Sequence, residues 1–332
     1  GAATLMWRID CGPNMASMNS TEINIIAYDW DEDGKAEVVL RGADNMIVYG
    51  PDGKKKIFEV GDMTVNTRNK MNSHTNGQYA WTHTGAEYLI YMNGSTGAKY
   101  QVITYPLKRL ESGESSEKSA WGDDYGHRST KHFLGAPFLD GRKPSIFLGR
   151  GCYTRHKMCA LDVDPVTHQL TQRWRWDNNA GWSDPWFGNG FHNFQIADTD
   201  WDGRDEIVFG SMIIDDNGQG LCTTGLGHGD AQHCSDFDPY RHGQEQFTCN
   251  EDEPACTYWN ATTGQIYYRL QSTGDDGRAL CGNFSNQFPG CLGRTTQTGL
   301  VSTVADKVIE GGPATGDAND ALYWSHLNQR IY

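Results

Sequence analysis

The sequence contains no long hydrophobic run and almost nothing that would form a helix. None of its apolar stretches approaches the ~20 residues that a membrane-spanning helix needs. The longest of them, such as residues 23–28, have the length of a strand. No segment of more than a turn or two repeats apolar residues at the spacing of an amphipathic helix. These absences argue against a helical bundle and against membrane helices in this chain.

Basic residues are scarce relative to acidic ones. The 332-residue chain has 28 Lys and Arg against 42 Asp and Glu, which gives a formal net charge of −14 at pH 7. A chain this acidic is not suited to binding nucleic acid through a basic surface. It could bind an acidic polymer only if bound cations reversed the charge locally. We therefore expect neither a nucleic-acid partner nor a membrane partner.

The nine cysteines show no C-x-x-C spacing, so they do not predict a zinc site of the common kind. An odd number leaves at least one thiol unpaired. Three pairs lie close enough in sequence to bridge local hairpins or loops: Cys152 with Cys159, Cys249 with Cys256, and Cys281 with Cys291. The alternative is that these cysteines are buried as small hydrophobic residues.

Short runs rich in β-branched and aromatic residues alternate with clusters of Gly, Asp and Asn. Examples are residues 37–40, 46–49, 88–91, 146–148, 206–209 and 265–268. Asp-Gly or Thr-Gly turns at residues 52–53, 96–97 and 263–264 separate such runs. Many short strands at regular spacing predict an all-β fold: a sandwich, a barrel or a propeller.

An internal repeat decides among these three architectures. Residues 29–40 align without gaps on residues 198–209, a looser copy spans 235–247, and a degenerate copy spans 139–148. Each copy is followed by a strand, a Gly-containing turn and another strand. One four-stranded antiparallel blade per repeat, arranged radially, is a β-propeller. We expect residues 1–332 to form a single propeller domain.

The repeat carries an acidic loop of the D-x-D-x-D-G type. Acidic residues occupy relative positions 1, 3, 5 and 9 of both gapless copies, and calcium takes six to eight oxygen ligands of this kind. The looser copy offers three acids. The predicted calcium ligands are Asp29, Asp31, Asp33 and Glu37; Asp198, Asp200, Asp202 and Glu206; and Asp236, Asp238 and Glu245. The alternative is a solvated acidic turn held by hydrogen bonds from Asp side chains to the backbone.

The middle of the chain resembles a known family. The segments that carry the resemblance are residues 121–128, 149–155, 188–193, 210–218 and 224–231, the last reading Thr-Gly-Leu-Gly-His-Gly-Asp-Ala. Together with the acidic loops, they resemble the catalytic propeller of the rhamnogalacturonan lyases of polysaccharide lyase family eleven. The resemblance runs from about Trp7 to Gly264 and fades after Cys281.

The resemblance implies an eight-bladed propeller with several bound Ca²⁺ ions and a deep cleft. It also implies cleavage of rhamnogalacturonan I, a pectin component, by β-elimination between rhamnose and galacturonate. The expected protein is secreted, extracellular or periplasmic, and monomeric. Against the family pattern, we expect this chain to lack an N-terminal β-domain and some propeller blades.

The family chemistry needs a neutralised carboxylate and a base, because the proton beside a uronate carboxylate is only weakly acidic. His192 and His228 lie in Gly-rich loops, and with Asp230 and Glu251 they could form a calcium site of a second type near the substrate. A direct catalytic role for either histidine is an alternative. A further alternative is that both are hydrogen-bonded loop histidines.

Cationic and aromatic residues of the matched segments complete the predicted site. Lys131 and Arg150 are predicted to act in catalysis, and Arg128 and Arg155 to bind galacturonate carboxylates, which suit Arg bidentately. Salt bridges to the abundant Asp residues are the alternative. Tyr153 and Trp121 could stack on sugar rings, although core packing is the competing fate of such residues.

A non-catalytic, calcium-binding propeller that binds carbohydrate or protein is the competing function. The two histidines and the Gly-Leu-Gly-His-Gly-Asp-Ala segment favour the lyase, because a plain scaffold has no use for them.

Overall fold

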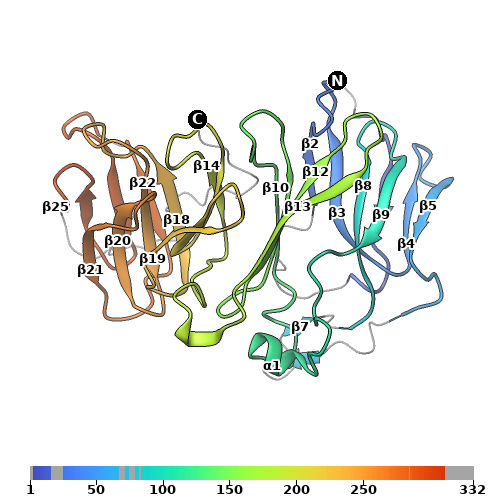
Figure 1. Ribbon diagram of the computed structural model, residues 1–332, viewed down its shortest axis with the longest axis horizontal. Coiled ribbons are helices and arrows are strands. Elements are labelled where there is room, and N and C mark those ends of the chain that lie inside the picture. The colour runs from blue at the N-terminus through green and yellow to red at the C-terminus, as the bar shows by residue number, and fades with distance from the viewer. Residues whose placement is uncertain are drawn as a thin grey trace. The chain divides into compact units, whose positions relative to one another are not determined.

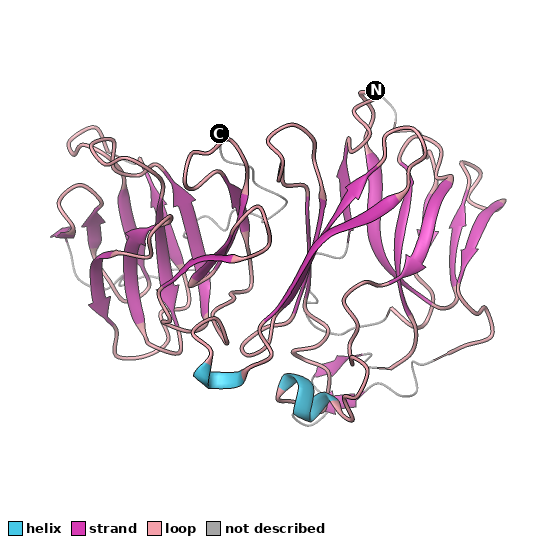
Figure 2. Ribbon diagram, in the orientation of Figure 1, coloured by secondary structure: helices cyan, strands magenta, loops and turns pink. Residues whose placement is uncertain are grey.

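The computed structural model describes residues 3–15, 25–66, 72–74, 79–81, 84–283 and 285–310. Within these residues, helix is limited to α1 (Glu117–Trp121) and one 3-10 turn, Gly181–Ser183; everything else that is regular is strand (Figure 2). None of the described helices has the length and apolar character needed to cross a membrane. The predicted all-β class is confirmed.

Most of the strands form four-stranded sheets in which chain order is also spatial order. Neighbouring strands pair antiparallel, as in the registers of β14 with β15 and β18 with β19. The first two such sheets are β10 (His132–Gly135), β11 (Ile146–Arg150), β12 (Lys157–Val163) and β13 (Leu170–Asp177), then β14 (Gln195–Ala197), β15 (Glu206–Phe209), β16 (Met212–Ile214) and β17 (Gly220–Thr223). The next two are β18 (Gly229–Ser235), β19 (Glu245–Asn250), β20 (Ala255–Asn260) and β21 (Ile266–Gln271), then β22 (Ala279–Gly282), β23 (Leu292–Thr295), β24 (Leu300–Ser302) and β25 (Lys307–Glu310).

The N-terminal part departs from this order. Its four-stranded sheet runs β2 (Ile25–Tyr28), β3 (Glu37–Ala43), β8 (Glu87–Asn93) and β9 (Lys99–Thr104). The intervening strands pair elsewhere: β4 (Met46–Tyr49) joins β1 (Arg8–Asp10) and β5 (Lys56–Val60), while β6 (Asn72–His74) pairs with β7 (Tyr79–Trp81). The strand that follows the first acidic copy, at 46–49, therefore lies in another sheet, unlike the strands that follow the other copies. Asn45, at φ +63°, turns the chain, and its N–H donates to Val60 at 3.1 Å, which commits β4 to the other sheet.

The acidic loops occupy one topological position. The loop at 29–37 joins β2 to β3, the loop at 198–206 joins β14 to β15, and the loop at 236–245 joins β18 to β19. The degenerate copy at 139–148 lies between β10 and β11. Each therefore connects the first and second strands of its own four-stranded sheet. The interpretation of the repeat as one sheet per copy is confirmed.

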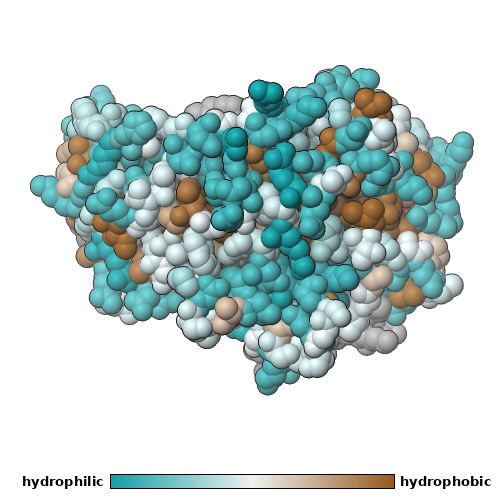
Figure 3. All heavy atoms as spheres, in the orientation of Figure 1, coloured by the Kyte–Doolittle hydropathy of each residue, from teal (hydrophilic) through white to brown (hydrophobic). Residues whose placement is uncertain are grey.

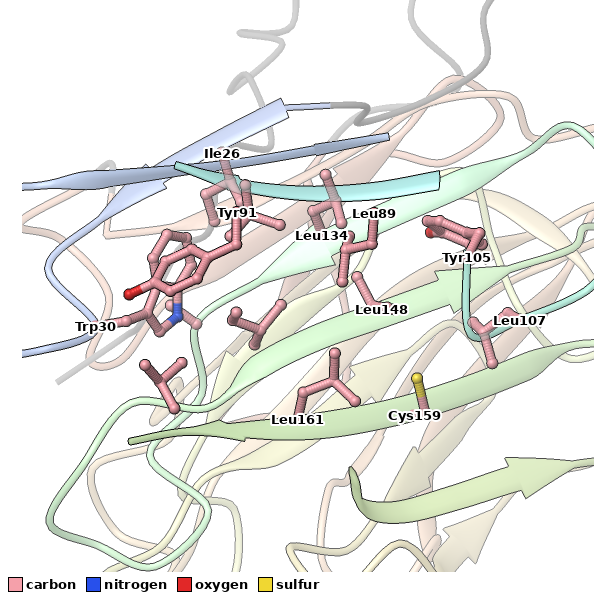
Figure 4. Packing of buried hydrophobic residues seen from close by; sticks show 14 residues of the cluster. Ile26, Trp30, Leu89, Tyr91, Tyr105, Leu107, Leu134, Leu148, Cys159 and Leu161 are labelled. Atoms are coloured by element: carbon pink, nitrogen blue, oxygen red, sulfur yellow. The ribbon is translucent and has the colours of Figure 1, made fainter. Parts of the chain in front are cut away.

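The chain divides into two compact units. The first comprises residues 1–136, 144–151 and 157–175, and the second comprises 137–143, 152–156 and 176–332. In the first unit, Val39, Leu89 and Tyr91 pack against Leu134, Leu148 and Leu161 of the β10–β13 sheet (Figure 4). Two sheets thus bury their facing sides against each other.

The second unit repeats this face-to-face packing. Val208 and Ile213 of the β14–β17 sheet share a core with Trp259 of the β18–β21 sheet. Phe247 and Tyr258, on the β18–β21 sheet, share a second core with Val301 of β24. Figure 1 shows the strands of this unit, coloured from yellow to red.

All nine cysteines are free thiols, so the disulfide interpretation is wrong for the three pairs. Cys249 and Cys256 face each other across β19 and β20 yet remain unlinked. Seven of the nine are buried, which confirms the alternative that most are small core residues.

At the surface, the face seen in Figure 3 is largely hydrophilic, with hydrophobic residues in small groups.

Candidate functional site

The first acidic loop gathers its carboxylates. Oxygens of Asp29, Asp31 and Asp33 lie within 4.8 Å of one another. The backbone bends at φ +85° at Gly34, whose N–H donates to Asp29 at 3.0 Å. Glu37 accepts from the N–H of Trp30 at 3.0 Å. Burial, with smaller contributions from the neighbouring aspartates, raises the pKa of Glu37 to about 7.

The second loop has the same construction. Gly203 stands at φ +91°, and its N–H donates to Asp198 at 3.0 Å. Oxygens of Asp198, Asp200 and Glu206 gather within 4.8 Å, and burial raises the pKa of Glu206 to about 9. Asp202 instead lies 3.9 Å from the guanidinium of Arg204. Converging oxygens whose ionisation is disfavoured by burial are the donor set that a hard divalent cation such as calcium prefers.

The third loop contains a cation of its own. Glu245 accepts from the N–H groups of Phe237 and Asp238 at 2.9 and 3.1 Å, as the glutamates of the other loops accept from theirs. Asp238, however, lies 3.1 Å from Nε of Arg241. Arg241 also pairs with Asp306 at 3.0 Å and lies over the ring of Tyr267. Its guanidinium supplies positive charge beside Asp238.

The predicted histidine site comes together in the second unit. His192 precedes β14, His228 precedes β18 and Glu251 follows β19. Nδ1 of His228 lies 2.7 Å from the carbonyl oxygen of Gly190, which only accepts; Nδ1 therefore carries a proton, and Nε2 is the ring nitrogen left to face other groups. That Nε2 lies 3.6 Å from Glu251 and 4.0 Å from Asp230.

The rest of this site surrounds the same atoms. Nε2 of His192 lies 3.4 Å from Asp230 and 3.1 Å from the hydroxyl of Tyr153. The Tyr153 ring packs 4.2 Å from the ring of His228. His228 is fully buried, whereas the side chains of His192 and Glu251 are 24% and 42% exposed. The cluster is thus open to solvent on one side.

Burial and neighbouring charges set the electrostatics of this site. Burial is the main cause that raises the pKa of Asp230, and His192 partly opposes it. Burial, followed by the charges of Asp275 and Asp230, raises the pKa of Glu251. Arg278 reaches Asp230 at 3.3 Å. Arg278 pairs with Asp230, and Nε2 of His228 faces both Asp230 and Glu251.

Sequence reasoning missed a residue of this cluster. Sγ of Cys152 lies 3.9 Å from Nδ1 of His192, and Cys152, His192 and His228 each offer a ligand atom within 4.8 Å of the others. The signal was present, because Cys152 belongs to the matched segment 149–155. Its spacing from the histidines in sequence gave no hint of their proximity.

The predicted Arg150 lies in the interior of the first unit, 1% exposed. Its Nη1 lies 2.7 Å from Glu87, and its Nε donates to Ser129 at 2.6 Å. Arg109 and Arg41 approach the same glutamate at 2.9 and 3.5 Å. Burial alone would raise the pKa of Glu87, but the three arginines lower it to about 2.

The remaining predicted residues differ in exposure. Trp121 is buried in α1, where its Nε1 donates to Arg109 at 2.6 Å, and Lys131 is also buried. Nε and Nη2 of Arg155 each donate a hydrogen bond of 2.7 Å to the carboxylate of Asp177. The side chain of Arg128 is 29% exposed. Trp121, Arg128, Lys131 and Arg150 belong to the first unit, and Tyr153, Arg155, His192 and His228 to the second.

Comparisons with known proteins agree along the whole chain. Residues 2–331 match the family model described as "Rhamnogalacturonan lyase family 11, C-terminal domain". The match continues well past Cys281, after which the sequence resemblance was expected to fade. The chain is 34% identical to a rhamnogalacturonan exolyase of Bacillus subtilis, YesX, over 97% of this chain and 50% of that protein. It is 35% identical to the endolyase YesW of the same organism, over 97% of this chain and 48% of that protein.

The solved structures agree with these matches. The crystal structure of the exotype lyase YesX superposes with a TM-score of 0.79 at 32% identity, covering 92% of this chain and 49% of that one. A Bacillus licheniformis rhamnogalacturonan lyase superposes with a TM-score of 0.77 at 31% identity, covering 93% of this chain and 49% of that one. The chain spans about half the length of the curated relatives it matches.

Proposed function

The chain belongs to rhamnogalacturonan lyase family 11, and we propose that the protein containing it cleaves rhamnogalacturonan I between rhamnose and galacturonate by β-elimination. The observation that carries this proposal is the cluster of His192, His228 and Asp230, which lie within the segments that carry the resemblance, with Glu251; the cluster is open to solvent on one side. Because the substrate is a large polysaccharide, we also propose that the protein acts outside the cytoplasm.

β-Elimination breaks the C5–H bond of galacturonate and the C4–O bond to the leaving sugar. A double bond forms between C4 and C5, a base takes the C5 proton, and the leaving oxygen acquires a proton. The reaction requires that a nearby positive charge neutralise the galacturonate carboxylate. We propose that His228, Asp230 and Glu251 hold a calcium ion, with His192 beside them; bound there, it would neutralise the substrate carboxylate.

The residues of the chain have separable roles in this proposal. The carbonyl of Gly190 fixes the tautomer of His228, so that Nε2 faces the carboxylates. The hydroxyl of Tyr153, 3.1 Å from Nε2 of His192, is placed to exchange a proton with that ring. Tyr153 and Arg128 keep partly exposed side chains, so we propose that they contact sugar. We propose that the buried Trp121, Lys131, Arg150 and Arg155 position other groups instead.

Calcium is also proposed as a structural element. The donor sets of the loops at 29–37 and 198–206 fit it, whereas Arg241 supplies the charge at 236–245. The recurrence of this loop between the first two strands of the sheets that contain it supports the proposal that the sheets are blades of a propeller, eight-bladed in the complete family architecture. Such ions would tie the ends of neighbouring strands together.

The test is the reaction of the full-length protein with rhamnogalacturonan I. Elimination leaves an unsaturated uronate that absorbs in the ultraviolet, so absorbance should rise with calcium and stay flat when a chelator is added. Binding to the polysaccharide with no rise in absorbance under either condition would replace the lyase with the non-catalytic, carbohydrate-binding alternative.

A further inference from the structure

Cys152, His192 and His228 form a second donor set, distinct from the oxygen-rich one. One ligand atom from each lies within 4.8 Å of the other two. His228, Asp230 and Glu251 form a separate group under the same distance limit. The two groups share His228. One offers a sulfur and imidazole nitrogens, and the other offers carboxylate oxygens with the His228 nitrogen.

The turn after β11 holds Cys152 in place. Gly151 stands at φ +112° and Tyr153 at φ +65°, and the N–H of Thr154 donates to the Cys152 carbonyl at 2.8 Å. The carbonyl of Thr154 accepts from Gly188 at 2.8 Å, which ties this turn to the segment that leads to His192. Cys152 is fully buried and therefore does not depend on a surface rotamer for its position.

The geometry suits a soft divalent ion. Zinc binds thiolate at about 2.3 Å and imidazole at about 2.0–2.1 Å, so a tetrahedral site has sulfur and nitrogen roughly 3.5 Å apart. Cys152 Sγ and His192 Nδ1 are 3.9 Å apart before any ion draws them together. Calcium takes oxygen ligands and has little use for a thiol. Thiolate and imidazole together select the zinc class of ions.

We propose that Cys152, His192 and His228 bind a thiophilic divalent cation of the zinc and cadmium class. On binding, the Cys152 thiol releases its proton to solvent, and both histidines coordinate through neutral rings. The ion enters past the partly exposed His192. Because this ion binds the two histidines that also belong to the proposed calcium site, it acts as an inhibitor. This inhibitory consequence rests on the proposed lyase function, whereas binding itself does not.

Binding is tested by titrating metal-free protein with Cd²⁺ in excess Ca²⁺ and recording the ultraviolet absorbance of the cadmium–thiolate bond. A Cys11→Ser background removes the exposed thiol. In that background we expect one equivalent to give the band, Cys152→Ser to abolish it, and Cys222→Ser to leave it intact. Cys222 is the matched control because it is buried in the same unit and its thiol donates to Ala261.

A band that survives in Cys152→Ser, or that never forms in the parent, overturns the proposal. If Cys152→Ser fails to fold by circular dichroism, His192→Gln at its partly exposed position decides instead. We expect it to weaken Cd²⁺ at least tenfold, and undiminished affinity overturns the site.

The inhibitory consequence needs its own measurement. Zn²⁺ should suppress elimination at concentrations that leave Cys152→Ser active relative to its own zinc-free rate. Equal inhibition of parent and variant refutes that consequence. Cd²⁺ binding to a protein that shows no elimination at all would instead refute the proposed function and leave the metal site standing.

Discussion

Arg150 and Glu87 form a buried ion pair in which Nη1 lies 2.7 Å from Oε2. Two further arginines share the same carboxylate in the interior of the first unit. One of them, Arg109, also lies 3.5 Å from Glu117. Removing one partner of a buried pair leaves the others uncompensated, which costs far more than the net value of the pair.

Glu87→Gln should therefore be strongly destabilising. We expect a loss of about 3–5 kcal/mol, because the amide cannot offset the charge of Arg41, Arg109 and Arg150. Urea unfolding of the two proteins measures the difference. Glu59→Gln is the control: Glu59 pairs with Lys56 at the surface, and its loss should cost below about 0.5 kcal/mol. Similar losses from both substitutions would show that the buried cluster contributes no more to the free energy of unfolding than a surface ion pair does.

The same carboxylate predicts a defined acid sensitivity. The folded-state pKa of Glu87, about 2, lies below its ordinary value of 4.5. The folded state therefore binds the proton less readily than the unfolded state, and the stabilisation is complete above about pH 4.5. It is lost as the pH falls from there toward about 2. The stability gap between parent and Glu87→Gln should shrink over this window, and a gap of constant size would contradict the assignment.

Calcium removal should lower thermal stability through the acidic loops. A ligand at 100 times its dissociation constant adds about 2.7 kcal/mol to the folded state, so chelation should lower the melting temperature clearly. Asp31→Asn should remove part of that calcium-dependent shift, because Asp31 belongs to the gathered carboxylates.

Asp52→Asn is the matched control for the loop substitution. Asp52 accepts from the N–H groups of Lys54 and Lys55 in an exposed turn, much as the loop aspartates accept from their own backbone. Its substitution should leave the calcium-dependent shift unchanged. If both variants keep the full shift, the loop at 29–37 is an ordinary acidic turn.

His228→Ala should abolish elimination. The substitution removes the nitrogen that faces Glu251 and Asp230, and loss of such a ligand should reduce turnover by more than 100-fold, above the 10–100-fold typical of outer-shell partners. The rate of unsaturated product formation measures it. His233→Ala is the control, because Nε2 of His233 lies 2.9 Å from the carbonyl oxygen of Ala279 rather than beside these carboxylates. Full activity in His228→Ala would reject the assignment of the site.

Several of these features could be predicted from the sequence because they are local. A D-x-D-x-D-G loop closes through its own backbone, so the gathering of Asp29, Asp31 and Asp33 follows from their spacing alone. The placement of β4 with β1 could not be predicted, because it depends on pairing between residues such as Ile9 and Val48, which are far apart in the sequence, rather than on strand propensity.

The burial of two predicted site residues has a similar cause. Trp121 and Arg150 are predicted at the site, with core packing and a salt bridge as the alternatives; the structure buries both, and a backbone carbonyl and Glu87 pair with them there. Nothing in the neighbouring sequence of Arg150 reveals a partner 63 residues away. Cys152 was missed for a parallel reason, since its imidazole neighbour is 40 residues distant.

The third acidic loop allows a test of whether an arginine and a calcium ion can replace each other in offsetting the negative charge of the loop. Arg241 lies 3.1 Å from Asp238 and so occupies the place of a cation in the loop at 236–245. Arg241→Gln should leave Asp236, Asp238 and Glu245 with uncompensated charge, which calcium would then offset. We expect the variant to bind one more calcium ion than the parent by metal analysis after dialysis, and to become more sensitive to chelators. An unchanged calcium content would mean that the loop lacks the oxygen geometry for the ion, and that Arg241 stabilises it only by pairing with Asp238 and Asp306.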